Sequence, residues 1–214
     1  MSESFEQNTP AEQPPEPGTE SPAAFEKLDD RELMRRAMHG ERTPYAVLFQ
    51  RHAARIWRMG YLILHSGDSA DDVVQDTFER GLSNIHTYLG QGDPGVWFSS
   101  IALNVCRHYL RARHRQAELT ETSQLEQGRR PLRPRTQGVV TNAIRRESSR
   151  KLMLALGYLT EPQREVFVLH YINGLPYEDV GKILGIRPGA ARGLAHRARA
   201  VLREKLALEN QKEP

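Results

Sequence analysis

Arginine and histidine side chains recur at helical spacing toward the end of the chain. Arginine binds phosphate oxygens and offers a planar pair of donors that fits guanine O6 and N7. At about 100° per residue these side chains form one stripe on a helix, about 110° from an apolar face centred on Ala191 and Ala198. The stripe consists of Arg192, His196, Arg199 and Arg203, with Arg187 just before it. The pattern predicts a helix that binds nucleic acid, although a solvated basic face would have the same sequence.

The segment 177–196, which contains Arg192 and His196 of this stripe, is typical of a helix-turn-helix motif. Gly181 lets two helix backbones touch, and Gly185 permits the positive φ of a tight turn. Apolar residues stand where the two helices must face each other: Val180, Leu184, Ile186, Ala191 and Leu194. The second helix is then the one that enters the major groove. An ordinary helical hairpin is the alternative.

No arrangement of side chains predicts catalysis, a cofactor or a metal. Gly90–Gly95 matches G-x-G-x-x-G, but no strand precedes it, as a dinucleotide site requires. The histidines lack metal-binding spacing, and the single cysteine, Cys106, excludes an internal disulfide. Asp71, Asp72 and Asp76 lie near a helix start, where carboxylates favour the helix dipole or a basic partner. We therefore expect a protein that is not an enzyme.

Charge and composition divide the chain. Residues 1–27 hold six glutamates and one lysine and are rich in proline, which predicts a disordered acidic tail. Because the whole chain carries +3, the remainder carries +8. No apolar run is long enough to cross a bilayer, and residues 1–10 are acidic and polar, without the basic and apolar regions of a signal peptide. These features predict a cytoplasmic protein without membrane insertion.

Apolar residues at helical period predict an all-α fold of two small helical domains joined by a flexible linker. Asp29 or Asp30 is expected to cap the first helix, and Ser69 the third. Pro131, Pro134 and a lack of apolar period mark the linker. The predicted ranges are a tail 1–27, a domain 28–115, a linker 116–141, a helix-turn-helix domain 142–208 and a tail 209–214.

Several segments together carry a family resemblance. The segments 72–78, 97–104, 164–169, 174–180 and 196–199 are similar to D-L-V-Q-E-T-F, W-L-x-x-I-A-x-N, R-x-V-F-x-L, E-G-L-S-Y-x-E-I and H-R-A-R. Their order and spacing resemble the extracytoplasmic-function (ECF) group of bacterial sigma-70-type factors.

This resemblance implies an alternative sigma factor that binds core RNA polymerase, at the beta-prime clamp and the beta flap, and directs initiation at promoter DNA. It implies polymerase docking by Asp72, Gln75 and Asp76. It implies contacts with the −10 element by the loop Gly90–Gly95 and by Asn104, Arg107 and Arg111. It also implies contacts with the −35 element by residues of the helix-turn-helix and the helix that continues from it: Arg187, Arg192, His196, Arg199 and Arg203. An anti-sigma factor is a further expected partner.

The recognition helix departs from the family pattern. Gly189–Leu194 stands where the family has G-T-V-K-S-R, so the usual hydroxyl contacts are missing. Two other functions stay open: a stand-alone helix-turn-helix regulator that dimerises on palindromic sites, and a protein that binds polymerase without reading DNA. The acidic tail is either an inert extension or a competitor of DNA for the basic stripes.

Overall fold

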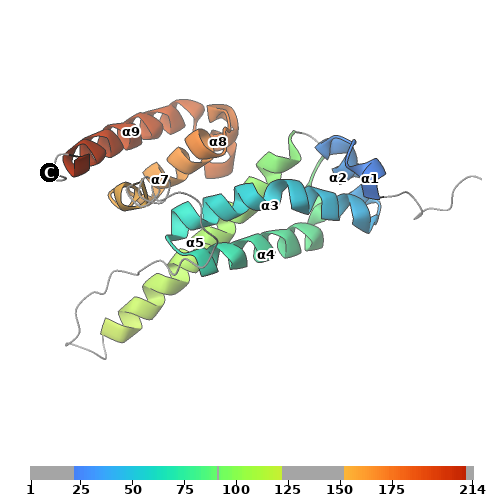
Figure 1. The fold of residues 1–214 in the computed structure, drawn as a ribbon, viewed down its shortest axis with the longest axis horizontal. Coiled ribbons are helices and arrows are strands. Elements are labelled where there is room, and N and C mark those ends of the chain that lie inside the picture. Colours follow the sequence, from blue (N-terminus) through green and yellow to red (C-terminus); the bar gives the residue numbers. More distant parts are fainter. Residues whose placement is uncertain (1–21, 91, 122–151, 211–214) are drawn as a thin grey trace, which may run out of the picture.

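The computed structural model describes residues 22–90, 92–121 and 152–210. Over these residues the chain forms helices and no strand, which confirms the predicted all-α fold class. The elements in chain order are α1 (Pro22–Phe25), α2 (Asp30–Met38), α3 (Arg42–Leu64), α4 (Gly67–Ser83), the 3-10 helix η1 (Ile85–Thr87), α5 (Pro94–Glu121), α7 (Glu161–Phe167), the π-helix η2 (Val168–Ile172), α8 (Tyr177–Leu184) and α9 (Pro188–Asn210) (Figure 1). We call α1–α5 the N-terminal group and α7–α9 the C-terminal group.

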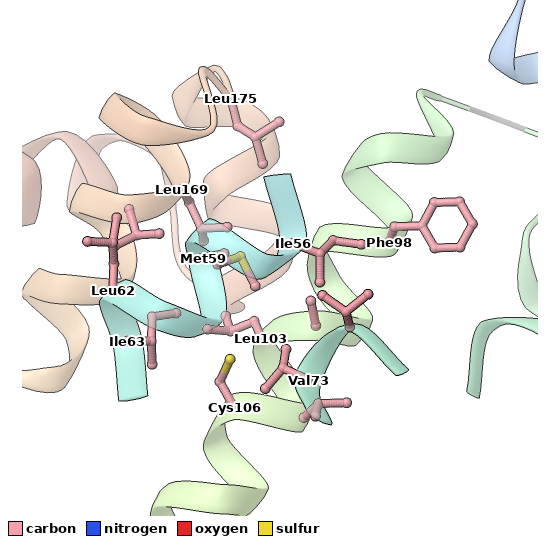
Figure 2. Packing of buried hydrophobic residues seen from close by; sticks show 14 of the residues in the cluster. Ile56, Met59, Leu62, Ile63, Val73, Phe98, Leu103, Cys106, Leu169 and Leu175 are labelled. Atoms are coloured by element: carbon pink, nitrogen blue, oxygen red, sulfur yellow. The ribbon is translucent and has the colours of Figure 1, made fainter. Parts of the chain in front are cut away.

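The N-terminal group is built around α3, whose apolar residues recur every three or four positions. Ile56, Met59 and Ile63 are at most 2% exposed, and α3 packs against both α4 and α5. Phe98 and Leu103 of α5 complete this core from the other side (Figure 2). Because three helices bury one apolar stripe each against the others, they fix the outward faces of α4 and α5.

Helix starts in this group follow local capping chemistry. Asp29 is the N-cap of α2, as predicted, and its Oδ1 accepts a hydrogen bond from the Glu32 amide at 2.8 Å. The prediction of Ser69 as the N-cap of α4 is wrong. Ser66 is the cap, and its Oγ accepts from the Ser69 amide at 3.2 Å. Asp68 occupies the first turn, where a carboxylate complements the helix dipole.

The N-terminal group extends past the predicted domain boundaries, residues 28 and 115, at both ends. Phe25, predicted to lie in the tail, is 4% exposed and packs beneath the Arg36 guanidinium, 5.0 Å from the ring centroid. Arg51 donates to the Glu26 carbonyl at 2.6 Å, which ties this segment to α3. At the other end, α5 continues through Arg115 to Glu121. The rest of the predicted tail, 1–21, and the linker residues 122–141 lie outside the described residues.

The C-terminal group folds α7, η2 and α8 against α9. The side chain of Gln163 accepts a hydrogen bond from the Thr160 amide at 3.1 Å, which completes a capping box at the start of α7. Val166, Leu169 and Val180 are fully buried against Ala195 and its neighbours on α9.

The two groups share one core. Helix α3 contacts η2, and α5 contacts α8. Leu169 and Leu175 project from the C-terminal group toward Met59 of α3 (Figure 2), and the Asn173 amide donates to the Met59 sulfur at 3.4 Å. The C-terminal group therefore lies against α3 and α5 rather than apart from them (Figure 1).

Candidate nucleic-acid interface

The helix-turn-helix takes the geometry that its glycines predict. Gly185 adopts φ 69° and ψ 32° and ends α8. A Cβ on Gly181 would lie 2.7 Å from the Ile186 carbonyl oxygen, so only glycine fits this crossing. Val180 and Ala191 are fully buried between the helices, whereas Leu184, Ile186 and Leu194 are half-buried.

The predicted basic stripe lies on the exposed side of α9. Arg192, His196, Arg199 and Arg203 are all exposed, as is Arg187 in the turn. About 110° around the helix from the stripe, Ala191, Ala195, Ala198 and Leu202 form the buried face. The structure thus brings the five predicted −35 residues onto one accessible surface, suited to a polyphosphate partner.

Two tyrosines beneath this stripe were not predicted as site residues. The Arg192 guanidinium lies 5.4 Å from the ring centroid of Tyr177, and the Arg199 guanidinium lies 5.7 Å from that of Tyr171. Tyr171 lies in η2, far from α9 in the sequence, so no local spacing pairs it with an arginine. Tyr177 is the first residue of α8 and belongs to the motif segment 174–180.

The predicted −10 residues lie along one side of α5. Asn104 and Arg111 are exposed. Arg107, between them, is turned toward the C-terminal group, where its Nε and Nη2 each donate to a Glu165 oxygen at 2.7 Å. The Glu165 side chain is only 7% exposed, against 34% for Arg107. The hydrogen bonds with Glu165 raise the pKa of Arg107. Arg107, a residue predicted to contact DNA, is therefore held by Glu165 in a bidentate ion pair.

The glycine loop opens directly on α5, and the 3-10 helix η1 precedes it. Gly90 and Gly92 adopt φ 71° and 97°. The Gly92 carbonyl accepts from the Tyr88 hydroxyl at 3.0 Å and from Arg31 Nε at 3.1 Å. Leu89 at the start of the loop is 81% exposed. The loop is therefore tethered at Gly92, and Leu89 beside it presents an apolar side chain to solvent.

The predicted polymerase-docking residues lie on the outer face of α4. Asp72 and Gln75 are exposed, and Asp76 is half-exposed with its Oδ2 3.4 Å from Arg80 Nη2. Gln75 also borders a shallow groove between α3 and α4, which is otherwise lined by Phe49, Ala53, Ala54, Trp57, Asp71 and Val74. The Trp57 indole donates to Asp71 Oδ1 at 2.8 Å and is 37% exposed. An acidic, amide-bearing face with an adjoining apolar groove can complement a basic helical partner.

A second polar cluster closes the C-terminal end of α3. Arg113 of α5 donates to the Leu64 carbonyl at 2.9 Å, and Arg164 of α7 donates to the Ile63 carbonyl at 3.4 Å. Two cations at a helix C-terminus are favourable for its dipole. His65 lies between them with φ 56°, and its pKa is lowered to about 4, first by burial and then by Arg164 and Arg113.

The described residues show neither a metal site nor a membrane-spanning helix. Within residues 22–90, 92–121 and 152–210, no cluster of three or more histidine, cysteine, aspartate or glutamate side chains is placed to hold a metal. None of the described helices is both long and apolar enough to cross a membrane. Cys106 is fully buried, and burial raises its pKa to about 12.

Family profiles match residues of both helical groups. The profile of sigma-70 region 2 matches residues 48–116, and that of sigma-70 region 4 matches residues 149–202. The RNA polymerase sigma factor CarQ of Myxococcus xanthus is 33% identical over 184 residues, which cover 81% of this chain and 95% of CarQ. The ECF RNA polymerase sigma factor BldN of Streptomyces coelicolor is 26% identical over 78% of this chain, which spans 62% of the BldN length.

Solved structures show the same fold. The structure of CnrH in complex with the cytosolic domain of CnrY matches with a TM-score of 0.63 at 26% identity, over 86% of this chain and 99% of that one. The sigma factor RpoE in complex with the anti-sigma factor NepR, from Bartonella quintana, matches with a TM-score of 0.58 at 23% identity, over 74% and 93%. From its motifs, its two matched regions and these relatives, the chain belongs to the extracytoplasmic-function group of the sigma-70 family of RNA polymerase sigma factors.

Proposed function

We propose that this chain binds core RNA polymerase and directs it to promoters by reading a −10 and a −35 element. One observation carries the proposal: a single chain presents an acidic face on α4 and a separate basic stripe on α9, on different helical groups. An acidic face repels DNA and attracts a basic protein surface, whereas the basic stripe attracts DNA. A factor that joins polymerase to a promoter needs both.

Each face has an assigned role. Asp72, Gln75 and Asp76 dock on the polymerase clamp, and the stripe of α9 contacts the −35 element. On α5, Asn104 and Arg111 are free to meet the −10 strand, while Arg107 becomes available once it leaves Glu165. The chain performs no reaction itself and acts where the polymerase acts, in the cytoplasm. An anti-sigma factor, as NepR is for RpoE of Bartonella quintana, is the partner that would oppose it.

Two substitutions test the roles separately in the full-length protein. Asp76→Arg reverses a charge on α4 and should abolish co-elution with core polymerase on a sizing column. Arg199→Ala should leave co-elution intact but weaken promoter binding by the holoenzyme about 5- to 100-fold, the loss of one good arginine contact. Glu204→Ala on the exposed side of α9 is the matched control and should change neither. Co-elution of Asp76→Arg at the wild-type level would contradict the docking assignment.

The same co-elution assay tests the role of the acidic tail. The full chain and a variant without residues 1–27 should both form a stoichiometric complex if the tail is inert. Complex formation only after its removal would make it inhibitory. No complex in either case, together with dimerisation on palindromic DNA, would favour the stand-alone regulator.

A further inference from the structure

A continuous stack of side chains runs beneath the recognition helix. The rings of His170 and Tyr177 lie parallel, with centroids 3.9 Å apart at 23°, and Tyr171 meets His170 edge-on at 4.6 Å. Arg192 lies over Tyr177 at 5.4 Å and Arg199 over Tyr171 at 5.7 Å. We call Tyr171, His170 and Tyr177 the aromatic shelf. Both of its outer rings carry an arginine of α9.

The local sequence builds the shelf rigidly. His170 Nδ1 donates to the Leu175 carbonyl at 2.8 Å, which fixes the orientation of the central ring. Leu169 on one side of it is fully buried and anchors η2 in the core. Phe167 supports Tyr171 from the preceding helix, with centroids 5.1 Å apart. A π-helical turn at this point shifts the register of the chain by one residue, a distortion that is frequent at functional sites.

The two arginines are matched to the shelf by helical geometry. Arg192 and Arg199 are seven positions apart, so at about 100° per residue they differ by only about 20° around α9. Both lie at the shoulder of the helix, next to its buried alanine face. A guanidinium that lies over a ring keeps its N–H donors in its own plane, above the ring, where they can form a bidentate pair with guanine or phosphate.

We infer that Tyr171 and Tyr177 are positioning residues that hold Arg192 and Arg199 ready for DNA and thereby set the −35 specificity of the protein. The inference rests on the proposed function, in which these arginines contact the promoter. A free arginine loses rotamer entropy when it binds, and an arginine already held on a ring loses less. The shelf also supplies a fixed point for a recognition helix that lacks the hydroxyl residues of the family pattern between Gly189 and Leu194.

The chain contains its own control. Lys205, farther along α9, lies 5.2 Å from the ring centroid of Tyr158, which is 60% exposed. Tyr158→Leu therefore removes a similar cation–ring contact on the same helix but outside the recognition stripe. It should leave promoter recognition unchanged.

The experiment uses the full chain assembled with core polymerase. A promoter duplex is selected by the wild-type holoenzyme from a randomised pool, and its affinity is measured beside duplexes with single −35 substitutions. Tyr171→Leu and Tyr177→Leu should each lower affinity for the selected duplex about three- to tenfold, the scale of one cation–ring contact. They should also reduce discrimination against the substituted duplexes. Tyr171→Phe and Tyr177→Phe, which retain the rings, should rescue both quantities.

Salt dependence separates positioning from charge. The leucine variants retain every arginine, so the slope of log affinity against log salt should stay at the wild-type value, whereas Arg199→Ala should reduce it by about 1. Leucine variants that fold normally yet bind and discriminate like the wild type would overturn the inference. Unchanged −35 discrimination in Arg192→Ala and Arg199→Ala would instead overturn the assignment of α9 in the proposed function.

A measurement on the wild-type protein tests the inference even if the leucine variants do not fold. The order of arginine Nε–H groups in the free protein can be compared by NMR relaxation. Among the described residues, Arg203 of the same stripe has no aromatic ring beneath it and serves as the reference. Arg192 and Arg199 should be more ordered than Arg203. Equal order for the three would contradict the inference.

Discussion

Arg107→Ala should separate the two helical groups. The Glu165 carboxylate accepts two hydrogen bonds of 2.7 Å from Arg107 and is 7% exposed, so removal of the arginine leaves a buried charge without its partner. Breaking a buried ion pair in this way costs about 3–5 kcal/mol. Because Arg107 is 34% exposed, water weakens this pair, and about 2–3 kcal/mol is the expected cost.

The cost should appear as separation of the groups rather than as global unfolding. Water reaches Glu165 once the C-terminal group leaves α5, and this solvation limits the penalty. A loss of about 2 kcal/mol raises the open-to-closed ratio about thirtyfold. Glu165→Gln should have a smaller effect, about 1–2 kcal/mol, since its amide oxygen still accepts from Arg107 and the arginine can also turn to solvent.

Pulsed electron paramagnetic resonance measures this separation directly. Spin labels on cysteines introduced at Glu79 of α4 and Ala200 of α9 occupy exposed positions on the two groups. The native Cys106 should not react, since it is fully buried and its pKa is raised to about 12. The wild type should give one narrow distance distribution, and Arg107→Ala a broader and longer one.

Matched variants decide the interpretation. Lys182→Ala breaks an exposed ion pair with Asp179 and should leave the distances unchanged, since such pairs contribute roughly 0–1 kcal/mol. Glu165→Gln opens the groups but retains Arg107, so it alone should strengthen binding to −10 DNA. A wild-type distance distribution in Arg107→Ala, with unchanged thermal unfolding, would refute the reasoning.

Two further predictions concern stability. Gly181→Ala should destabilise the C-terminal group by about 3 kcal/mol in thermal unfolding, since its Cβ would meet the Ile186 carbonyl at 2.7 Å, whereas Gly189→Ala, with open space around its Cβ, should be neutral or stabilising by about 0.5 kcal/mol. The pKa of His65 is lowered to about 4, first by burial and then by arginines such as Arg164. The unfolded chain therefore binds a proton that the folded chain refuses, and stability should fall between about pH 6.5 and pH 4, on the order of 2 kcal/mol after solvent screening of this half-buried ring. His65→Asn, which suits the left-handed backbone, should flatten this part of the pH profile, and an unchanged profile would contradict the assignment.

Local features of the molecule could be predicted from the sequence because they depend on neighbours within one or two turns. The range of α8, the capping box at Thr160, the αL conformation of Gly185 and the close crossing at Gly181 all follow from such short spacings. The stripe on α9 follows from helical period alone. The motifs were enough to identify the family, because a family motif is a series of residue types in a fixed order along the chain.

Some errors were local as well. Ser66 and Ser69 are both good caps, and only the packing of α4 against α3 decides which turn comes first. Phe25 lies in a polar, proline-rich segment that has too little apolar surface for composition to reveal that this residue is buried.

The partners of the charged residues depended on the tertiary structure. Arg107 and Glu165 are 58 positions apart, and Arg199 and Tyr171 belong to elements separated by α8 and by the turns on either side of it. Helical period states which way a side chain points but not which helix it meets, since that depends on how all the apolar faces pack together. The order of residues along the chain is therefore enough to predict the all-helical fold, the exposed stripe of α9 and the family of this protein. Only the packing of α3 and α5 against η2 and α8 decided that one predicted DNA contact is held by an ion pair and two others by aromatic rings.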